Sequence, residues 1–255
     1  MRVFVINLKK DSVRRLAAER QLNEAGIPYS MYTAIDGDDA RANCFDGYDE
    51  FACLMNIGRF LTDGEYGCFA SHRKLWEISA DTDEPLLIFE DDFCLQQGFV
   101  EAVHEVERNI EDFGFIRMQT DLRAKKRRVK DCGRFRLSRY TKAPHCMLCY
   151  AISPGVARIF LEKTRVIDAP VDVFVKKFWE HEQALFALTP YTVVTSELAL
   201  DSTISGRVKR SKPFRLATLR FLTKCDWYTR RFLFNVRSLR GENRRFRRLT
   251  SSKSL

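Results

Sequence analysis

Apolar and polar positions along the first 35 residues predict a strand, a helix and a second strand. Val3-Phe4-Val5-Ile6 is a continuous apolar run of the kind found in a buried strand. Asp11-Ser12 can cap a helix that Gly26 ends, and Tyr29 to Ile35 returns to extended chain. This order is typical of the start of an α/β sheet.

The next segment predicts a loop, a helix and a central strand. Residues 38–60 show little periodicity and are predicted as a loop-rich insertion. Thr62 and Glu65 have the spacing of a capping box, so a helix is expected to follow them over Gly67 to Ile78. Leu86 to Phe89 is continuously apolar, as a parallel strand covered on both faces must be.

The second half of the chain continues the alternation of helices and strands. It predicts helices over 97–110, from Ser153 onward and over 173–188, and strands over 113–119, 146–152 and 191–194. The basic segment 123–139 is predicted as a surface loop or an edge hairpin. Together these elements predict one α/β domain with a central, mostly parallel sheet over residues 1–205.

Charge separates this domain from the tail. The chain carries a net charge of +9, but residues 206–255 hold 16 Lys and Arg against two acids, which leaves −5 for residues 1–205. The tail interleaves its basic residues with aromatic and aliphatic ones, which is typical of amphipathic helices on an anionic membrane. We expect residues 206–255 to bind such a surface; the alternatives are nucleic-acid binding, for which no motif is present, and a solvated pair of helices.

Neither a signal peptide nor an apolar run of about 18 residues is recognisable, so we expect a cytoplasmic body. The eight cysteines are then expected to be reduced. Cys146 and Cys149, with His145 beside them, have one spacing that zinc sites use, but a second ligand pair is missing from the sequence. We therefore interpret them as strand residues.

The strongest chemical signal is the triplet Glu90-Asp91-Asp92 directly after the apolar strand. Three adjacent carboxylates repel one another when they are partly desolvated, so a cationic partner is expected. Mg²⁺ or Mn²⁺ prefers oxygen ligands and bridges phosphate oxygens, and ligands of open α/β sheets bind at such strand ends. A solvated acidic turn is the alternative.

The ordered motifs around this triplet resemble those of glycosyltransferase family 25, which includes lipooligosaccharide galactosyltransferases of Gram-negative bacteria. The motifs are Val5-Ile6-Asn7-Leu8 with Arg14, Ile35-Asp36-Gly37, Leu61-Thr62-x-Gly64-Glu65-x-Gly67-Cys68-x-x-Ser71-His72-x-x-x-Trp76 and Ile88-Phe89-Glu90-Asp91-Asp92. Later landmarks are Tyr150 to Ala157, Pro170-Val171-Asp172, Pro190 and Ser202-x-Ile204. The resemblance spans about residues 2–205.

This resemblance implies a GT-A-like fold, a UDP-sugar donor, and inverting transfer of a hexose, most often galactose, to a lipooligosaccharide core. By analogy with Asp-x-Asp enzymes, Glu90 is expected to face the ribose or the metal, and Asp92 to be the firmest ligand of a metal–diphosphate. Asp91 is expected at the same donor site. Glucosyl or N-acetylhexosaminyl transfer, and a non-catalytic membrane or nucleic-acid adaptor, are the alternative functions.

Other polar residues are expected around the donor. Asn7 can contact the uracil or ribose and Arg14 the phosphates, although a solvated helix arginine is the alternative for Arg14. Asp36 is expected near the uridine, or in an ordinary Asp-Gly turn. Ser71 and His72 are expected to line the donor pocket.

Several of these predictions carry a structural alternative. Glu65 is expected near the donor but fits a pure capping role, and a buried histidine is the alternative for His72. The resemblance, together with the need of an inverting enzyme for a carboxylate base, favours Asp172 as the base. A helix N-cap is the alternative for Asp172, and Asp168 is the reserve base.

The remaining expectations concern residues after 170. A third metal ligand is sought at His181 or Asp201, and the sequence does not choose between them. Trp179 lies in an aromatic segment more typical of core, but can also stack on a sugar. With a lipid-linked acceptor, the protein is expected as a peripheral protein on the inner face of the bacterial inner membrane, with no nucleic acid as a partner.

Overall fold

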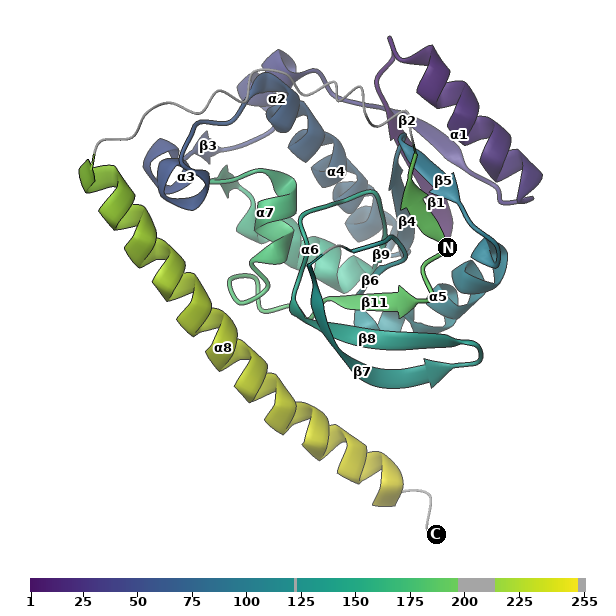
Figure 1. Ribbon diagram of the computed structural model, residues 1–255. Coiled ribbons are helices and arrows are strands. Elements are labelled where there is room, and N and C mark those ends of the chain that lie inside the picture. The colour runs from purple at the N-terminus through teal and green to yellow at the C-terminus, as the bar shows by residue number, and fades with distance from the viewer. Residues whose placement is uncertain (122, 197–213, 252–255) are drawn as a thin grey trace.

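The computed structural model describes residues 1–121, 123–196 and 214–251. A central sheet of eight strands has the order β2-β1-β4-β9-β6-β11-β8-β7 (Figure 1). Its strands are β1 (Arg2–Asn7), β2 (Ser30–Thr33), β4 (Leu86–Glu90), β6 (Phe115–Arg117), β7 (Lys125–Cys132), β8 (Phe135–Lys142), β9 (Cys149–Ile152) and β11 (Phe186–Thr189). Three of the seven pairings are parallel and four antiparallel, so the sheet is mixed, with a parallel portion formed by β2, β1 and β4.

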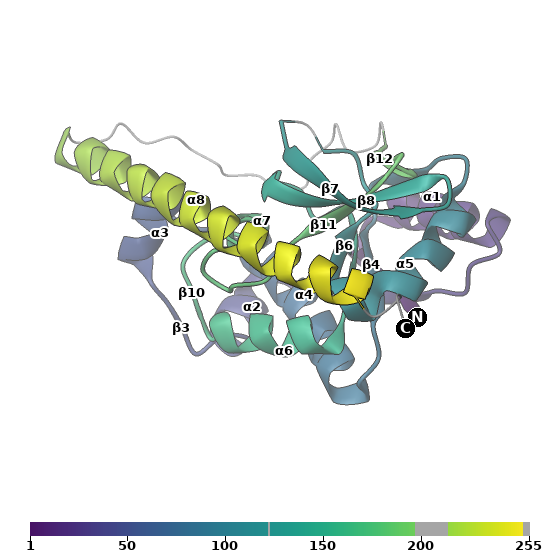
Figure 2. The same cartoon turned by 90° about the horizontal axis from the view of Figure 1, so that it is seen from below.

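The side chains of β1 explain why this strand lies inside the sheet. Successive side chains of a strand point to opposite faces, and both faces here are covered. Val3 and Val5 pack into one core with α1 (Ser12–Glu24) and α5 (Phe99–Phe113). Phe4 and Ile6 pack into the other with α4 (Asp63–Thr82), α6 (Pro154–Lys163) and α7 (Val171–Lys176). Figure 2 shows α1 and α6 on opposite sides of the sheet.

The helices that cover the sheet confirm the predicted α/β class and GT-A-like single domain. They are α1 (Ser12–Glu24) and α5 (Phe99–Phe113) on one face, and α4 (Asp63–Thr82), α6 (Pro154–Lys163) and α7 (Val171–Lys176) on the other. Small two-stranded sheets join β3 (Gly47–Tyr48) to β10 (Val166–Ile167) and β5 (Phe93–Leu95) to β12 (Val193–Thr195). Segment 123–139 belongs to the β7–β8 hairpin at the sheet edge, one of the two predicted alternatives.

The prediction of a loop over residues 38–60 was wrong. The segment forms α2 (Gly37–Asn43), β3 and α3 (Glu50–Ile57). Asp36 caps α2 by accepting a hydrogen bond from the N–H of Asp38, and Asp49 caps α3 through the N–H of Ala52. These short helices show little of the apolar periodicity that predicts longer ones, but their aspartate caps are visible in the sequence.

The predicted helix over 173–188 was also largely wrong. The helix α7 ends at Lys176, and the chain then turns irregularly before β11 begins at Phe186. Lys177 is buried and pairs with Asp168 at 3.1 Å and Glu180 at 2.7 Å, and Glu182 adopts a positive φ of 57°. The chain therefore leaves the helix at the buried Lys177, although the spacing of the aromatic residues favours a longer helix.

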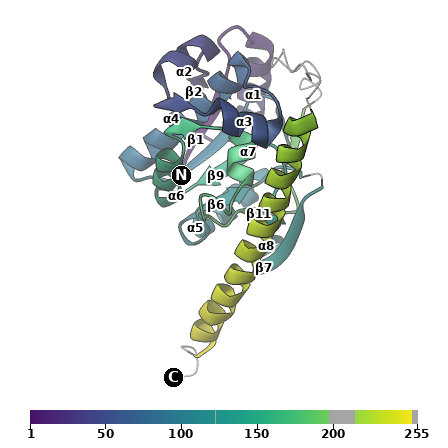
Figure 3. The same ribbon diagram turned by 90° about the vertical axis from the view of Figure 1, so that its left-hand side faces the viewer.

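The basic tail forms a long helix, α8 (Phe214–Ser251). Figure 3 shows α8 running past α3 and α7, with its C-terminal part extending away from the sheet. Trp227 and Phe234 pack on Trp179 and Phe178, and Asn235 donates to the carbonyl of Thr141. None of the helices in the described ranges is long and apolar enough to cross a bilayer. The boundary predicted near residue 205, the predicted ligand Asp201, and the landmarks Ser202 and Ile204 lie outside the described residues.

Candidate donor site

A pocket of about 360 Å³ opens where the parallel strands β2, β1 and β4 end. We call it the β4 pocket. It is lined by Ile6, Leu8, Lys10, Arg14, Ala34 to Asp38, Asp63, Gly64, Gly67, Cys68, His72 and Glu90 to Asp92. The predicted acidic triplet thus lies where an open α/β sheet binds its ligands.

Two glycines allow the walls of the β4 pocket to come together. A Cβ at Gly37 would lie 2.2 Å from the carbonyl oxygen of Asp63, and a Cβ at Gly67 would lie 2.4 Å from that of Ile35. Only glycine therefore permits the segment after β2 to pack this closely on the first turns of α4. Both glycines belong to the motifs singled out in the sequence.

Asp91 is occupied by protein partners. It accepts a hydrogen bond of 2.7 Å from the Asn7 amide and lies 3.3 Å from the Arg14 guanidinium. Burial raises the pKa of Asp91, and these two partners oppose that rise. Asn7 also donates to the carbonyl of Asp11, so its amide fixes the acidic segment instead of lining the pocket. Arg14 is only 8% exposed, which excludes the solvated alternative.

Glu90 ends a chain of hydrogen bonds that starts in the core. The Trp76 N–H donates to Tyr150 Oη at 2.9 Å, and Tyr150 Oη lies 2.9 Å from Nδ1 of the fully buried His72. His72 Nε2 then lies 3.3 Å from Glu90 Oε1. A proton on Nε2 satisfies this arrangement, because Nδ1 can accept the Tyr150 proton while Nε2 donates to Glu90. His72 lines the pocket as predicted and is also buried, so both interpretations hold.

Asp92 contrasts with Asp91. Its Oδ1 is buried and has no hydrogen-bond partner in the described residues, while its main-chain oxygen accepts from the Ser196 N–H at 2.8 Å. Burial, followed by the charges of Glu90 and Asp91, raises the pKa of Asp92 to about 6. A buried carboxylate oxygen without a donor fits a divalent cation, and Glu90 on the same pocket wall can supply a second oxygen.

Cys68 lies beside His72 and Glu90, although no chemical role was expected for it. Its Sγ lies 3.9 Å from Glu90 Oε1, and one ligand atom each of Cys68, His72 and Glu90 lie within 4.8 Å of one another. Burial raises the pKa of the Cys68 thiol well above its ordinary value. The spacing of four residues between Cys68 and His72, which places both on one face of α4, was the available signal.

Asp36 and Ser71, two of the residues expected at the sugar-donor site, form hydrogen bonds within the protein. Asp36 lines the β4 pocket while it caps α2. Ser71 is fully buried, donates to the Gly67 carbonyl and accepts from the Ile35 N–H, so the prediction that it lines the pocket was wrong. Its hydroxyl instead ties α4 to the segment after β2.

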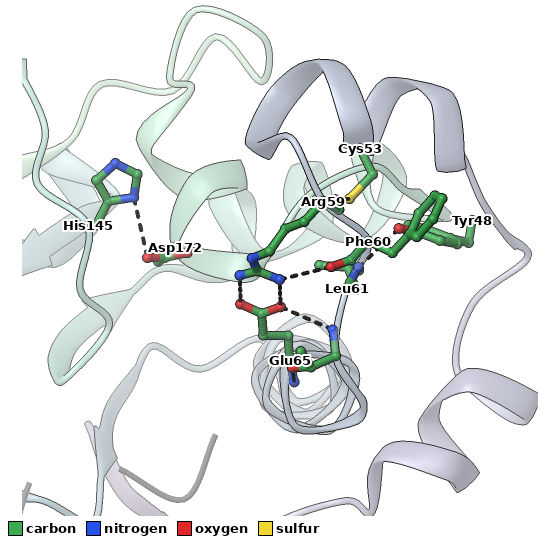
Figure 4. Close-up of polar contacts among 9 residues, drawn as sticks. Tyr48, Cys53, Arg59, Phe60, Leu61, Glu65, His145 and Asp172 are labelled. Atoms are coloured by element: carbon green, nitrogen blue, oxygen red, sulfur yellow. Dashed lines mark hydrogen bonds and ion pairs between the residues drawn. The ribbon is translucent and has the colours of Figure 1, made fainter. Parts of the chain in front are cut away.

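Glu65 lies beneath the surface at the start of α4, outside the pocket lining. It completes the predicted capping box with Thr62. Arg59 also donates to both of its carboxylate oxygens, at 2.5 and 2.6 Å (Figure 4). The Glu65 side chain is 3% exposed, so this paired contact neutralises a buried charge.

Asp172 lies in the first turn of α7, and Pro170 takes the N-cap position, which excludes the N-cap alternative for Asp172. Its Oδ2 is 3.4 Å from His145 Nδ1 (Figure 4). Burial acts to raise the pKa of Asp172, but His145, the Val173 N–H and Lys176 hold it below its ordinary value. Asp172 is outside the lining of the β4 pocket.

Asp168, the reserve candidate for the base, and His181, a candidate metal ligand, both contact other protein groups. Asp168 accepts from Asn56 at 2.8 Å and pairs with Lys177, so its carboxylate has partners. His181 is buried against Phe160, and its Nε2 lies 3.0 Å from the Val175 carbonyl. Burial lowers the pKa of His181 to about 4. His181 is outside the lining of the β4 pocket, where Glu90 and Asp92 lie, so the structure does not bring it to the expected metal site.

Comparison with known proteins agrees with this geometry. Residues 1–175 match the family described as Glycosyltransferase family 25 (LPS biosynthesis protein). A glycosyltransferase 25 family member of Drosophila melanogaster is 32% identical over 107 residues, which is 38% of this chain and 17% of that protein. Procollagen galactosyltransferase 1 of Danio rerio is 31% identical over 118 residues, or 43% of this chain and 19% of that protein.

A third relative, from Rattus norvegicus, is named a probable inactive glycosyltransferase 25 family member 3. It is 32% identical over 125 residues, 47% of this chain and 21% of that protein. The chain thus spans about a fifth of the length of these relatives. The family match itself covers more than half of the chain and contains the whole β4 pocket. The chain therefore belongs to glycosyltransferase family 25.

Proposed function

We propose that this protein transfers a hexose, in first place galactose from UDP-galactose, to a lipooligosaccharide or lipopolysaccharide core acceptor. The observation that carries the proposal is the buried, unpartnered Asp92 oxygen at the wall of the β4 pocket. Galactose is favoured because relatives are named procollagen galactosyltransferases. The acceptor class is favoured by the family's description as LPS biosynthesis proteins.

The charges around the β4 pocket fit a metal–diphosphate. Glu90 and Asp92 would hold Mn²⁺ or Mg²⁺, which when bound neutralises the departing diphosphate. Asp91 does not compete for the metal, because Asn7 and Arg14 hold it. The first turn of α4 also lines the pocket, and the positive end of a helix dipole favours a negative group there.

Asp172 is the proposed base. Its carboxylate is ionised at neutral pH and can therefore accept a proton. In an inverting reaction the acceptor oxygen attacks the anomeric carbon from the face opposite UDP. The acceptor proton passes to Asp172, the new C–O bond forms, and the old C–O bond breaks with its electron pair leaving on UDP.

We also propose that α8 lies on an anionic membrane surface at the inner face of the inner membrane. Phe221, Tyr228 and Phe232 are 63–65% exposed and follow one another at helical spacing, so they form one apolar face. A different face, with Trp227 and Phe234, packs on the protein. The net positive charge of the tail complements anionic headgroups. Nucleic acid is not an expected partner.

A non-catalytic adaptor of the same fold is the second candidate, because two relatives are named inactive or probably inactive. The two candidates differ in the importance of Asp92. An adaptor binds membrane through α8 and tolerates loss of this carboxylate, whereas an enzyme does not.

The testing experiment measures UDP release from UDP-galactose, UDP-glucose and UDP-N-acetylhexosamines, with truncated lipooligosaccharide as the acceptor. We expect turnover with UDP-galactose and its loss in Asp92→Asn, with Asp81→Asn as an exposed control. Turnover with another donor would correct the sugar. Absence of turnover with every donor, from folded protein that still binds anionic vesicles, would favour the adaptor.

A further inference from the structure

A second cavity, of about 550 Å³, lies between α8 and the catalytic domain. Its walls come from Arg123 before β7, from the segment after β8, from α7 with the turn that follows it, and from α8. Figures 1 and 3 show α7 beside α8. We call it the α8 cavity. It shares no lining residue with the β4 pocket.

Five lysine and arginine side chains line the α8 cavity: Arg123, together with a group of four cations, Lys142, Lys176, Lys224 and Arg231. Within the described part of the chain, none of the four forms an ion pair with a carboxylate. The pKa of Lys176 is lowered to about 8, first by burial and also by Arg231, Lys142 and Lys224, although Asp172 opposes this. Four cations that repel one another around a cavity are stabilised when an anion enters it.

Aromatic residues supply the rest of the wall. Trp227 and Tyr228 both line the cavity, with Lys176 Nζ 5.4 Å from the Trp227 ring centre and the Arg231 guanidinium 4.9 Å from that of Tyr228. Trp179 also lines it; this residue is 6% exposed, yet its indole N–H has no acceptor in the described residues. A buried donor of this kind calls for an acceptor such as a hydroxyl.

We infer that the α8 cavity binds a phosphate-bearing saccharide. The cations match the phosphate, the aromatic rings match the faces of a sugar ring, and the Trp179 N–H can donate to a sugar hydroxyl. The cavity has the volume of a small-ligand site, whereas a nucleic-acid strand needs an open groove. Phe221 and Phe232 of the apolar face of α8 lie outside the cavity lining, whereas Tyr228 belongs to both surfaces.

The location gives the α8 cavity a role that rests on the proposed function. His145 lines the cavity. Its Nε2 is 2.5 Å from Lys176 Nζ, and its Nδ1 is 3.4 Å from Asp172 Oδ2. A saccharide held by its phosphate at Lys176 is therefore separated from the proposed base by one imidazole ring. The cavity then selects acceptors that carry a phosphate near the hydroxyl that receives the hexose.

Calorimetric titration of the full chain with a hexose 6-phosphate tests the inference without any turnover. Saturating UDP and Mn²⁺ are present to fill the donor pocket. We expect the double variant Lys176→Ala/Arg231→Ala, which lacks two charged donors, to bind hexose phosphate at least about tenfold more weakly. A second variant, Trp227→Leu, tests whether the indole ring contacts the sugar. Arg237→Ala, an exposed arginine of α8 outside the cavity, is the matched control and is expected to change affinity less than about twofold.

Three comparisons identify the ligand. The neutral hexose and inorganic phosphate are each expected to bind more weakly than the hexose phosphate, and phosphatidylglycerol vesicles are expected not to displace it. Inorganic phosphate binding as tightly as the hexose phosphate would reduce the cavity to an anion site. Displacement by the vesicles would assign it to lipid headgroups, and equal binding by the Lys176→Ala/Arg231→Ala variant and the control would overturn the inference.

The same titration separates this inference from the proposed function. Asp92→Asn is expected to keep its affinity for the hexose phosphate, because Asp92 lies in the other pocket. If the parent protein and Asp92→Asn both bind hexose phosphate while the parent turns over none of the donor sugars, the α8 cavity stands and the transferase proposal fails.

Discussion

Asp91 and Asp92 are adjacent in sequence but differ in the hydrogen-bond partners of their carboxylates. Asp91 is fixed by Asn7 and Arg14, whereas the Oδ1 of Asp92 faces no donor in the described residues. The sequence predicted an acidic site at the end of β4. The resemblance singled out Asp92 as the firmest ligand, but the fixed state of Asp91 could not be predicted, because Asn7 lies 84 residues earlier in the chain.

The raised pKa of Asp92 predicts a pH dependence of stability. Between pH 3.8 and about 6 the folded state keeps a proton that the unfolded state releases, so stability falls as the pH rises through this window. In metal-free protein, Asp92→Asn is therefore expected to be more stable than the parent above pH 6, by about 1–2 kcal/mol after allowance for partial exposure. Urea unfolding at pH 4 and pH 7.5 measures this difference.

The control for this experiment is Asp81→Asn, whose side chain is exposed near the end of α4. It is expected to follow the parent at both pH values. Mn²⁺ is expected to raise the stability of the parent at pH 7.5 and to leave Asp92→Asn unchanged. An Asp92→Asn variant that is less stable than the parent at pH 7.5 without metal would contradict the account of this carboxylate.

Arg59 and Glu65 give a second prediction for single residues. Arg59→Ala removes both donors from a carboxylate that is 3% exposed, so we expect a loss of about 2–3 kcal/mol in the free energy of unfolding. Arg41→Ala is the matched control, because Arg41 pairs with Asp63 at the same helix start but in solvent, where loss of a pair costs under about 1 kcal/mol. Equal losses from the two variants, measured by urea unfolding, would show that burial of Glu65 is unimportant.

Among the elements, the contact of α4 with the segment after β2 shapes the β4 pocket. The sequence predicted the start of α4 well, because a capping box is a local signal. It did not predict α2 and α3, which are short helices. It also did not predict the end of α7, where the buried Lys177 pairs with Asp168 although the spacing of the aromatic residues favours a longer helix. The wrong predictions thus concern helices too short to show apolar periodicity and a helix end set by a buried ion pair.

Gly67→Ala tests the contact between these elements. Its Cβ would lie 2.4 Å from the Ile35 carbonyl oxygen, so the backbone on one side must move. We expect a loss of about 1–3 kcal/mol in stability and weaker UDP binding, because the moved segment is a pocket wall. Gly155→Ala in α6, where a Cβ meets nothing within 4 Å, is the control and is expected to keep both properties. Unfolding and UDP titration of both variants check this; unchanged UDP affinity in Gly67→Ala would contradict the role of the close approach.

At the level of the whole molecule, α8 has two distinct faces. Trp227 and Phe234 tie it to the domain, while Phe221 and Phe232 are exposed. The basic, amphipathic character of the tail was visible in the sequence. The α8 cavity could not be predicted, because its cationic residues come from four separate segments of the chain.

The exposed face of α8 gives a prediction for membrane binding. Replacing Phe221 and Phe232 by Ser is expected to weaken binding to phosphatidylglycerol vesicles about tenfold or more, because each ring loses apolar area buried in the interface. Phe51→Ser, which changes an exposed phenylalanine of α3, is the control. Sedimentation with vesicles at low salt measures it, and an unchanged bound fraction in the double variant would place the membrane contact elsewhere.

The central claim is that the β4 pocket holds a UDP-sugar through a metal at Asp92. The most direct measurement is calorimetric titration of UDP into the parent protein and Asp92→Asn, each with and without Mn²⁺. We expect Mn²⁺ to strengthen UDP binding to the parent at least about tenfold and to have no such effect on the variant. Tight UDP binding that is equal in the two proteins and indifferent to Mn²⁺ would contradict it.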